Sequence, residues 1–248
     1  MRNGVPRIRA TERTLAMLEA VIADDGRSSI AALARIAEVP IATAHRQVAT
    51  LVAKGYLTAA RGRHVAGPQL LSLLHQLDEK QIVVEVAQHW LEKLAVQLST
   101  IVQLGTLEND MVTYRIKAGR KSAELFTKVG MQLEAYCSGI GKVLLAYLPD
   151  LEREFYLGTG PFPALTAHTI TDPLELRGVL RQVRDDGFAF DRGEILEGIN
   201  CVAVPVIDKI GKAHAAISAT FADAGCAEKA LPFVMQTARG IEHATFGR

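Results

Sequence analysis

Residues 28–66, SSIAALARIAEVPIATAHRQVATLVAKGYLTAARGRHVA, decide the fold of the N-terminal part of this chain. A serine at position 28 or 29 can cap a short helix, because its side-chain oxygen accepts a hydrogen bond from an unpaired backbone N–H. Val39-Pro40 then ends the helix, since proline disfavours helical geometry in the residue before it. A second helix is predicted over residues 41–54, with Gly55 in the position that commonly follows a helix.

The second helix has two different faces. Its apolar residues recur at helical spacing and predict a buried stripe, formed by Ala44, Val48, Leu51 and Val52. The other face is small or polar, and its N-terminal half predicts DNA contacts through Ala42, Thr43, His45 and Arg46. Arg46 can reach a phosphate or the O6/N7 edge of a guanine.

A basic hairpin is predicted after this helix. Residues 56–58 would pair with residues 64–66, and Arg61 and Arg63 at the tip suit phosphate contacts. A helix over residues 11–24 precedes the pattern, and residues 1–10 predict a flexible basic arm. Together these elements indicate a winged helix-turn-helix, which places a helix in the major groove of DNA. A small helical bundle with a solvated charged face is the alternative.

The charge distribution favours the DNA-binding interpretation. Residues 1–66 hold ten Lys and Arg against five Asp and Glu, whereas the rest of the chain holds eighteen against twenty-two. The net charge of +1 therefore hides a basic head and a mildly acidic body. Such an asymmetry indicates that one part of the chain binds nucleic acid.

Composition indicates a globular protein of the cytoplasm. The 248 residues are enough for two domains, and 49% of them are hydrophobic. The N-terminus lacks the apolar core of a secretory signal, and no apolar run has the length of a membrane span. Cys137, Cys201 and Cys226 are an odd number at unrelated spacings, which argues against a disulfide framework and for a reducing compartment.

The remaining chain predicts a linker and a second domain. Leu70, Leu71, Leu73, Leu74 and Leu77 form an amphipathic face, which either pairs with a second chain or packs within this one. We expect a DNA-binding domain over 1–66, a linker helix over 67–80 and a second domain over 81–248. Its predicted helices are 82–97, 138–147, 150–157, 173–186 and 226–245, and its predicted strands are 100–106, 111–117, 124–126, 188–191, 200–207 and 213–221. This order predicts an α+β domain with an antiparallel sheet covered by helices.

Three stretches carry a resemblance to a known family. They are VGMQLEAYCSGIGKVLLAYLP (129–149), residues 165–206 with the pattern RDDGFAFDRGE, and AAISAT (215–220). With the helix-turn-helix ending in Gly55-Tyr56-Leu57, they resemble the IclR family of bacterial transcriptional regulators over nearly the whole chain. The resemblance implies a winged helix-turn-helix, a linker helix and a GAF-like effector-binding domain. It also implies dimers or dimers of dimers that bind double-stranded DNA at palindromic operators and sense small organic acids.

Two segments depart from the family pattern. Relatives often have a proline and a histidine where this chain reads Leu133-Glu134-Ala135-Tyr136. Many have a lysine and a serine where it reads Pro40-Ile41-Ala42-Thr43. The second departure leaves fewer polar groups for base contacts at the start of the second helix.

The same resemblance implies an effector site. Ser138, Gly139 and Ile140 begin a helix, whose N-terminus offers backbone N–H groups to a carboxylate. The resemblance adds Asp191, Cys201, Ser218 and Thr220 as polar contacts; Ser218 and Thr220 are two apart on a strand and share one face. Leu125, Met131 and Tyr136 would supply an apolar wall. Ser138 as a mere cap, Cys201 as a small buried residue and Asp191 as a turn residue are the competing interpretations.

Other chemistry finds little support in the sequence. Residues 138–143, SGIGKV, lack the first glycine and the final hydroxyl of a phosphate loop, since Tyr136 and Val143 occupy those positions. A zinc site from Cys137, Cys201, His168 and His214 matches no ligand spacing, so we predict no metal and no cofactor. No G-x-S-x-G elbow is present and no close His-carboxylate pair suggests catalysis, so we predict no catalytic residues. The alternatives to an effector-modulated regulator are a carboxylate-processing enzyme with a DNA-binding head and an architectural DNA-binding protein. The effector could be an aromatic acid, a sugar acid or a short keto acid, with the first favoured.

Overall fold

The computed structural model describes residues 7–60, 62–74, 78–119 and 125–247. The chain divides into two compact units, Met1–Asp78 and Glu79–Arg248, which are described separately.

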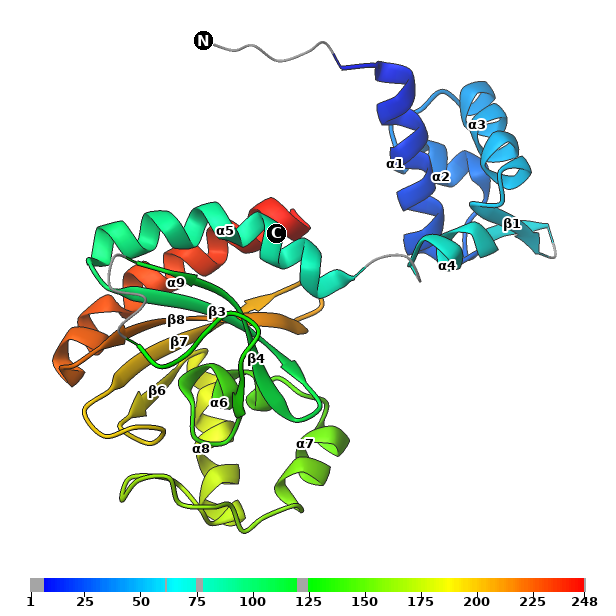
Figure 1. The fold of residues 1–248 in the computed structure, drawn as a ribbon. Helices are drawn as coiled ribbons and strands as arrows, with labels where there is room; N and C mark the ends of the chain where they lie inside the picture. The colour runs from blue at the N-terminus through cyan, green and yellow to red at the C-terminus, as the bar shows by residue number, and fades with distance from the viewer. Residues whose placement is uncertain (1–6, 61, 75–77, 120–124, 248) are drawn as a thin grey trace. The chain divides into compact units, whose positions relative to one another are not determined.

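The N-terminal unit is a winged helix-turn-helix, as predicted (Figure 1). Its elements are α1 (Arg9–Asp24), α2 (Ile30–Ile36), α3 (Ile41–Ala53), β1 (Leu57–Ala60), β2 (Arg63–Ala66) and α4 (Pro68–Leu74). The antiparallel hairpin β1–β2 is called the wing below. The three helices pack around a core that holds Met17, Val21, Leu33, Val48 and Leu51.

Local signals explain most of the helix boundaries. Ser29 caps α2, because its hydroxyl accepts a hydrogen bond from the N–H of Ala32 at 3.3 Å. Gly55 follows α3 with a φ of +77°, a conformation that glycine adopts without steric cost. Proline does not end α2 as predicted: the helix stops at Ile36, and a left-handed residue, Glu38 with φ +53°, turns the chain before Val39-Pro40.

The predicted N-terminal arm is too long. Helix α1 begins at Arg9 rather than Thr11, so Arg9 belongs to the helix. Residues 1–6 lie outside the described residues. The predicted linker helix is represented by α4, which has no buried residue, and Leu71 and Leu74 on it are 59% and 54% exposed. Leu77 lies outside the described residues.

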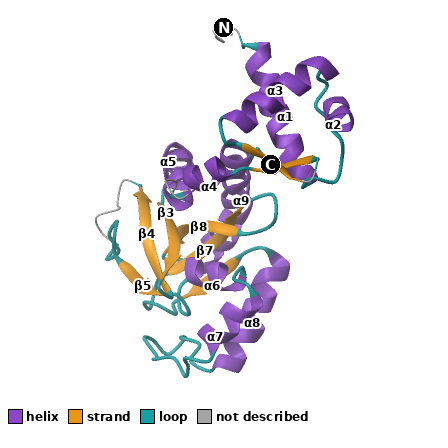
Figure 2. Cartoon of the chain, turned by 90° about the vertical axis from the view of Figure 1, so that its right-hand side faces the viewer, coloured by secondary structure: helices purple, strands orange, loops and turns teal. Residues whose placement is uncertain are grey.

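The C-terminal unit contains a six-stranded antiparallel sheet in the order β5-β4-β3-β8-β7-β6. The strands are β3 (Ile101–Glu108), β4 (Met111–Ala118), β5 (Gln132–Glu134), β6 (Ala189–Arg192), β7 (Asn200–Ile207) and β8 (Ala213–Phe221). The helices are α5 (Glu79–Leu98), α6 (Gly139–Ala146), α7 (Asp150–Leu157), α8 (Pro173–Asp186) and α9 (Ala224–Phe246). Figure 2 shows the sheet with helices on both sides. The predicted α+β fold with an antiparallel sheet is thereby confirmed.

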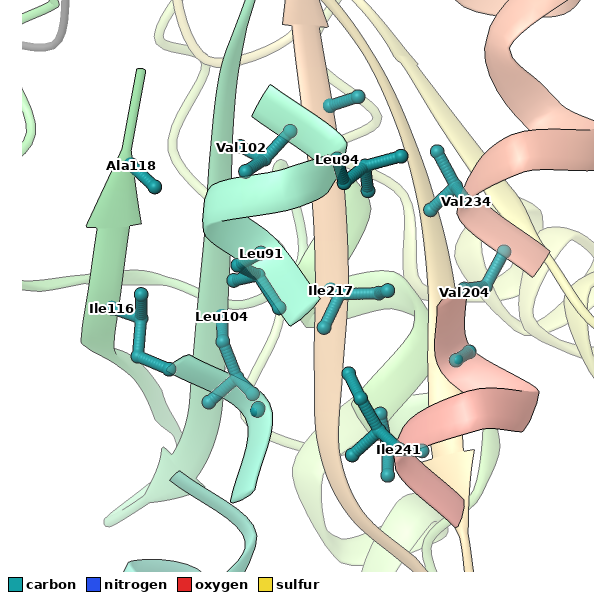
Figure 3. Packing of buried hydrophobic residues seen from close by; sticks show 14 of the residues in the cluster. Leu91, Leu94, Val102, Leu104, Ile116, Ala118, Val204, Ile217, Val234 and Ile241 are labelled. Carbon is teal, nitrogen blue, oxygen red and sulfur yellow. The ribbon is translucent and has the colours of Figure 1, made fainter. Parts of the chain in front are cut away.

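Each face of the sheet has its own apolar core. Helices α5 and α9 cover one face, where Leu91, Leu94 and Ile241 pack against Leu104 and Ile217 (Figure 3). Helices α6 and α8 cover the other face, where Leu144, Leu145, Leu176 and Leu180 belong to a second cluster. The alternation of strand residues between faces separates the two cores. The second face carries the candidate ligand site.

One predicted strand is wrong. Leu125 and Phe126 form a bend rather than a strand, and Glu124 lies outside the described residues. The edge strand is instead β5, which pairs with β4 through Val112 and Leu133. The side chain of Lys117 donates hydrogen bonds to the carbonyls of Leu125 and Thr127. These carbonyls therefore bond a side chain instead of a neighbouring strand.

Candidate nucleic-acid interface and ligand site

The exposed face of α3 holds the predicted DNA-contacting residues. Ala42, His45 and Arg46 are exposed and Thr43 is half-buried, whereas Ala44, Val48 and Leu51 point into the core. The helical period predicted from the sequence therefore separates these faces correctly. Small residues near the start of α3 allow close approach to a groove, and Arg46 adds a positive charge.

The wing is hydrogen-bonded to the turn that follows α1. The guanidinium of Arg63 donates a hydrogen bond to the carbonyl of Gly26 at 2.9 Å. Arg63 remains exposed, so its charge is also accessible to a phosphate. Arg61 lies outside the described residues.

A small cavity lies between α6 and the sheet in the C-terminal unit. Its walls include eight of the ten residues predicted for the effector site: Leu125, Ser138, Gly139, Ile140, Asp191, Cys201, Ser218 and Thr220. Six further residues complete the lining: Gln103, Tyr114, Phe126, Thr127, Ile195 and Ile199. The predicted alignment of Ser218 and Thr220 on one face of β8 is confirmed.

The N-terminus of α6 forms one wall of the cavity. Ser138 caps the helix, because its hydroxyl accepts a hydrogen bond from the N–H of Gly141 at 3.0 Å. A side chain at Gly139 would meet Asp191 at 3.7 Å and Ala203 at 3.3 Å, so this glycine lets the helix approach the sheet closely. The first N–H groups of a helix have no partner within it and carry its positive dipole end. This wall therefore suits an anion.

Asp191 is the carboxyl group among the cavity-lining residues and is 1% exposed. Its Oδ1 accepts a hydrogen bond from the N–H of Glu194 at 2.8 Å. Burial raises the pKa of this carboxyl to about 7, although that hydrogen bond and the nearby ammonium of Lys142 act in the opposite direction. Asp191 is therefore poised between its neutral and charged forms near neutral pH.

The floor of the cavity is polar. The hydroxyl of Thr220 and the thiol of Cys201 lie 3.4 Å apart on neighbouring strands. Gln103 on β3 pairs in register with Ser218, and its amide donates a hydrogen bond to the hydroxyl of Thr127 at 2.8 Å. Burial and the neighbouring Asp191 raise the pKa of the Cys201 thiol to about 12, so this thiol is neutral at physiological pH.

Two residues predicted for the apolar wall do not line the cavity. Tyr136 stacks on Phe162 with ring centroids 4.7 Å apart, and its hydroxyl donates a hydrogen bond to the carbonyl of Pro163 at 2.7 Å. Met131 lies beside β4, where its carbonyl accepts a hydrogen bond from the N–H of Tyr114. Tyr114 and Phe126 contribute the aromatic surface instead.

Of the cavity-lining residues that were not predicted, some are marked by a pattern in the sequence and others are not. Gln103 is a polar residue inside the apolar strand 101–105, and this pattern could have marked it. Ile195 and Ile199 carry no comparable signal, since they come from an irregular segment between β6 and β7.

The cavity itself has a volume of only about 20 Å³, room for about one water molecule. Beside it lies a groove of about 1050 Å³, which shares Leu125, Ile199 and Thr220 with the cavity.

Two family models together match most of the chain. The model described as the IclR helix-turn-helix domain matches residues 10–61. The model described as the bacterial transcriptional regulator IclR C-terminal region matches residues 74–243. The chain belongs to the IclR family.

Relatives of this IclR-family protein include named regulators. The Pca regulon regulatory protein of Pseudomonas putida is 28% identical over 95% of this chain and 83% of its own length. The regulator BhcR of Paracoccus denitrificans is 31% identical over 85% and 76% of the two chains. The crystal structure of an IclR homologue from Microbacterium hydrocarbonoxydans, complexed with 4-hydroxybenzoate, is 27% identical over 94% and 97%, with a TM-score of 0.62. The protein described here is accordingly a DNA-binding transcriptional regulator with an effector-binding domain.

Two further observations concern the part of this IclR-family chain that the structure describes. No group of three or more His, Cys, Asp and Glu side chains there is arranged to hold a metal ion. None of its helices combines the length and the apolar character that crossing a bilayer requires.

Proposed function

We propose that this regulator binds a palindromic operator through α3 and the wing, and that a small organic acid in the cavity beneath α6 changes its affinity for DNA. Residues 1–66 would bind DNA, 67–80 would link, and 81–248 would bind the effector and oligomerise. The cavity at the N-terminus of α6, with its eight predicted lining residues, is the observation that carries the proposal.

The chemistry of the cavity favours a monocarboxylate. The backbone N–H groups of Gly139 and Ile140 would hold the carboxylate at the positive end of α6. Asp191, Cys201, Ser218 and Thr220 offer further polar contacts, and Leu125, Ile140, Tyr114 and Phe126 offer apolar surface. An aromatic acid fits this combination, which is consistent with the 4-hydroxybenzoate in the Microbacterium homologue. The cavity would have to widen toward the adjoining groove to accept a ring.

The head would read DNA through one short helix face. Arg46, Thr43, His45 and Ala42 would meet the major groove, while Arg61 and Arg63 would contact flanking phosphates. The excess of positive charge in residues 1–66 supports this assignment. The exposed leucines of α4 support assembly into a dimer or a dimer of dimers. An effector can shift such an assembly only by the difference in its affinity for the two states.

A thermal-shift screen and a DNA titration test the proposal. A carboxylate that binds the native protein raises its unfolding temperature, and the same compound should change the anisotropy titration of promoter fragments from the protein's own locus. Ser218→Ala should weaken the effector response while operator affinity stays unchanged. Loss of both responses in this variant would indicate misfolding, and a full effector response would remove Ser218 from the site.

The same experiments separate the alternatives. A carboxylate-processing enzyme would consume the bound acid, whereas we expect no turnover from a cytoplasmic regulator. An architectural DNA-binding protein would bind promoter fragments but show no thermal shift with any acid.

A further inference from the structure

Three buried ionisable side chains lie together where α6 packs against the sheet, and one of them, Asp191, lines the cavity. The ammonium of Lys142 on α6 pairs with the carboxylate of Glu194, and Asp191 accepts a hydrogen bond from the backbone N–H of Glu194. Asp191, Lys142 and Glu194 are 1%, 2% and 6% exposed. This set is called the Asp191 cluster below.

When Asp191 is ionised, the net negative charge of the Asp191 cluster disfavours the binding of a further anion. Lys142 and Glu194 neutralise each other, so an ionised Asp191 leaves one uncompensated negative charge. A carboxylate at the N-terminus of α6 would add a second one, close to Asp191, because the start of α6 packs against this residue. Two like charges in a desolvated site repel each other strongly, and a shared proton relieves the repulsion.

We propose that the effector carboxylate binds together with one proton, which Asp191 holds so that its neutral carboxyl group donates a hydrogen bond to the effector. This inference rests on the proposed function, since it concerns the same cavity. Asp191 would then favour binding of a carboxylate rather than merely line the pocket. The effector carboxylate accepts a hydrogen bond, and Asp191 can donate one only when its own carboxyl group is protonated.

The neighbouring thiol and phenol groups do not take up the proton, so Asp191 is the group that carries it. The thiols of Cys137 and Cys201 and the phenol of Tyr114 have pKa values raised by burial, so they stay neutral with or without the effector. Their hydroxyl and thiol groups therefore take up no proton. His168 is exposed, on a segment whose Thr166 is bonded to the carbonyl of Gly193. Arg192 pairs at the surface with Glu228.

The pKa of Asp191 is raised to about 7, and this value sets the pH range in which the affinity for the effector should change. Below that value the free protein already carries the proton, whereas above it each effector molecule must bring one from solution. The apparent affinity for a carboxylate should thus fall about tenfold per pH unit above pH 7. Between pH 6 and pH 8.5 the expected loss is about 30-fold.

Calorimetric titration of the full chain tests the proposal. The probes are 4-hydroxybenzoate, benzoate and pyruvate, each titrated at pH 6.0, 7.0 and 8.5. At pH 8.5 the measurement is repeated in two buffers with different ionisation enthalpies, which counts the protons taken up. We expect about one proton per bound carboxylate at pH 8.5 and few at pH 6.0.

Asp191→Asn supplies the decisive variant. Its amide donates the hydrogen bond at every pH and its oxygen still accepts from the N–H of Glu194, so its affinity should be the same at pH 6.0 and 8.5. Asp223→Asn is the matched control: the residue is exposed and caps α9, a role that asparagine also fills, so its pH dependence should equal that of the wild type.

The outcomes distinguish this inference from the proposed function. Carboxylate binding without proton uptake, or with the same affinity at pH 6.0 and 8.5 in the wild type, overturns the role of Asp191 and leaves the effector class standing. Failure of all three acids to bind at any pH overturns both. The proton count on the wild type decides the matter even where Asp191→Asn does not fold.

Discussion

Lys142 on α6 and Glu194 in the segment after β6 form a buried ion pair, 52 positions apart in the sequence. The pair joins the helix that forms one wall of the cavity to the segment that carries Ile195 and Ile199 on another wall. One oxygen of Glu194, Oε2, is buried without a hydrogen-bond partner among the described residues. The buried negative charge of Glu194 is therefore compensated by the ammonium group of Lys142.

Removing Lys142 should destabilise the C-terminal unit substantially. Lys142→Met leaves the Glu194 carboxylate buried and unpaired, and such single removals cost about 3–5 kcal/mol. The double variant Lys142→Met/Glu194→Leu should recover most of this loss, because apolar pairs commonly replace buried ion pairs without penalty. Urea unfolding followed by the fluorescence of Trp90, the single tryptophan, on α5, measures both. Equal stability of Lys142→Met and wild type would show that the pair contributes nothing.

Asp191 should make stability fall as pH rises. Its pKa is raised from 3.8 to about 7 in the folded protein, so between these values the folded state binds more protons than the unfolded state. The contribution is fully present below about pH 4 and is lost as pH rises through 7, at up to about 1.4 kcal/mol per pH unit. Asp191→Asn should lack this component. Urea unfolding at pH 5, 6, 7 and 8 compares the slopes, and parallel curves for the two proteins would contradict the raised pKa.

Arg46 should contribute to operator affinity. If its guanidinium reads a base, Arg46→Ala should weaken specific binding by about 1–3 kcal/mol and relax specificity at one position. Arg239→Ala is the matched control, since it removes the same charge from the exposed surface of α9 in the C-terminal unit. Anisotropy titrations at several salt concentrations separate the base contact from a phosphate contact. An unchanged affinity would exclude Arg46 from the interface.

Two glycines in helices should respond oppositely to alanine. A Cβ at Gly141 would lie 2.1 Å from the carbonyl oxygen of Ala135, so Gly141→Ala must displace α6 from the segment before it and should cost several kcal/mol. Gly178 lies exposed in α8 with nothing within 4 Å of an added Cβ, and Gly178→Ala should stabilise by about 0.5–1 kcal/mol. Urea midpoints of the two variants test this contrast. A stabilised Gly141→Ala protein would contradict the close packing of α6.

The orientation of the Tyr136 side chain could not be predicted from the sequence. With Leu125 and Met131, Tyr136 was expected to supply the apolar wall of the site, but its ring stacks on Phe162 within the second core. The direction of that ring depends on residues 26 and 27 positions further along the chain, which no local pattern relates to it. Gln103 and Ile199 likewise reach the cavity only because β3 and the segment before β7 meet there.

The winged helix-turn-helix, the bounds of α7, α8, β7 and β8, and the caps at Ser29 and Ser138 follow from the sequence alone. Helical period, strand alternation and capping act over a few residues, so the chain carries these signals wherever it folds. The Lys142–Glu194 pair, the raised pKa of Asp191 and the shape of the cavity were decided only by tertiary structure. They require α6, β3, β4, β7 and β8 to exclude water from one place, and burial of this kind is a property of the assembled sheet and helices rather than of any segment.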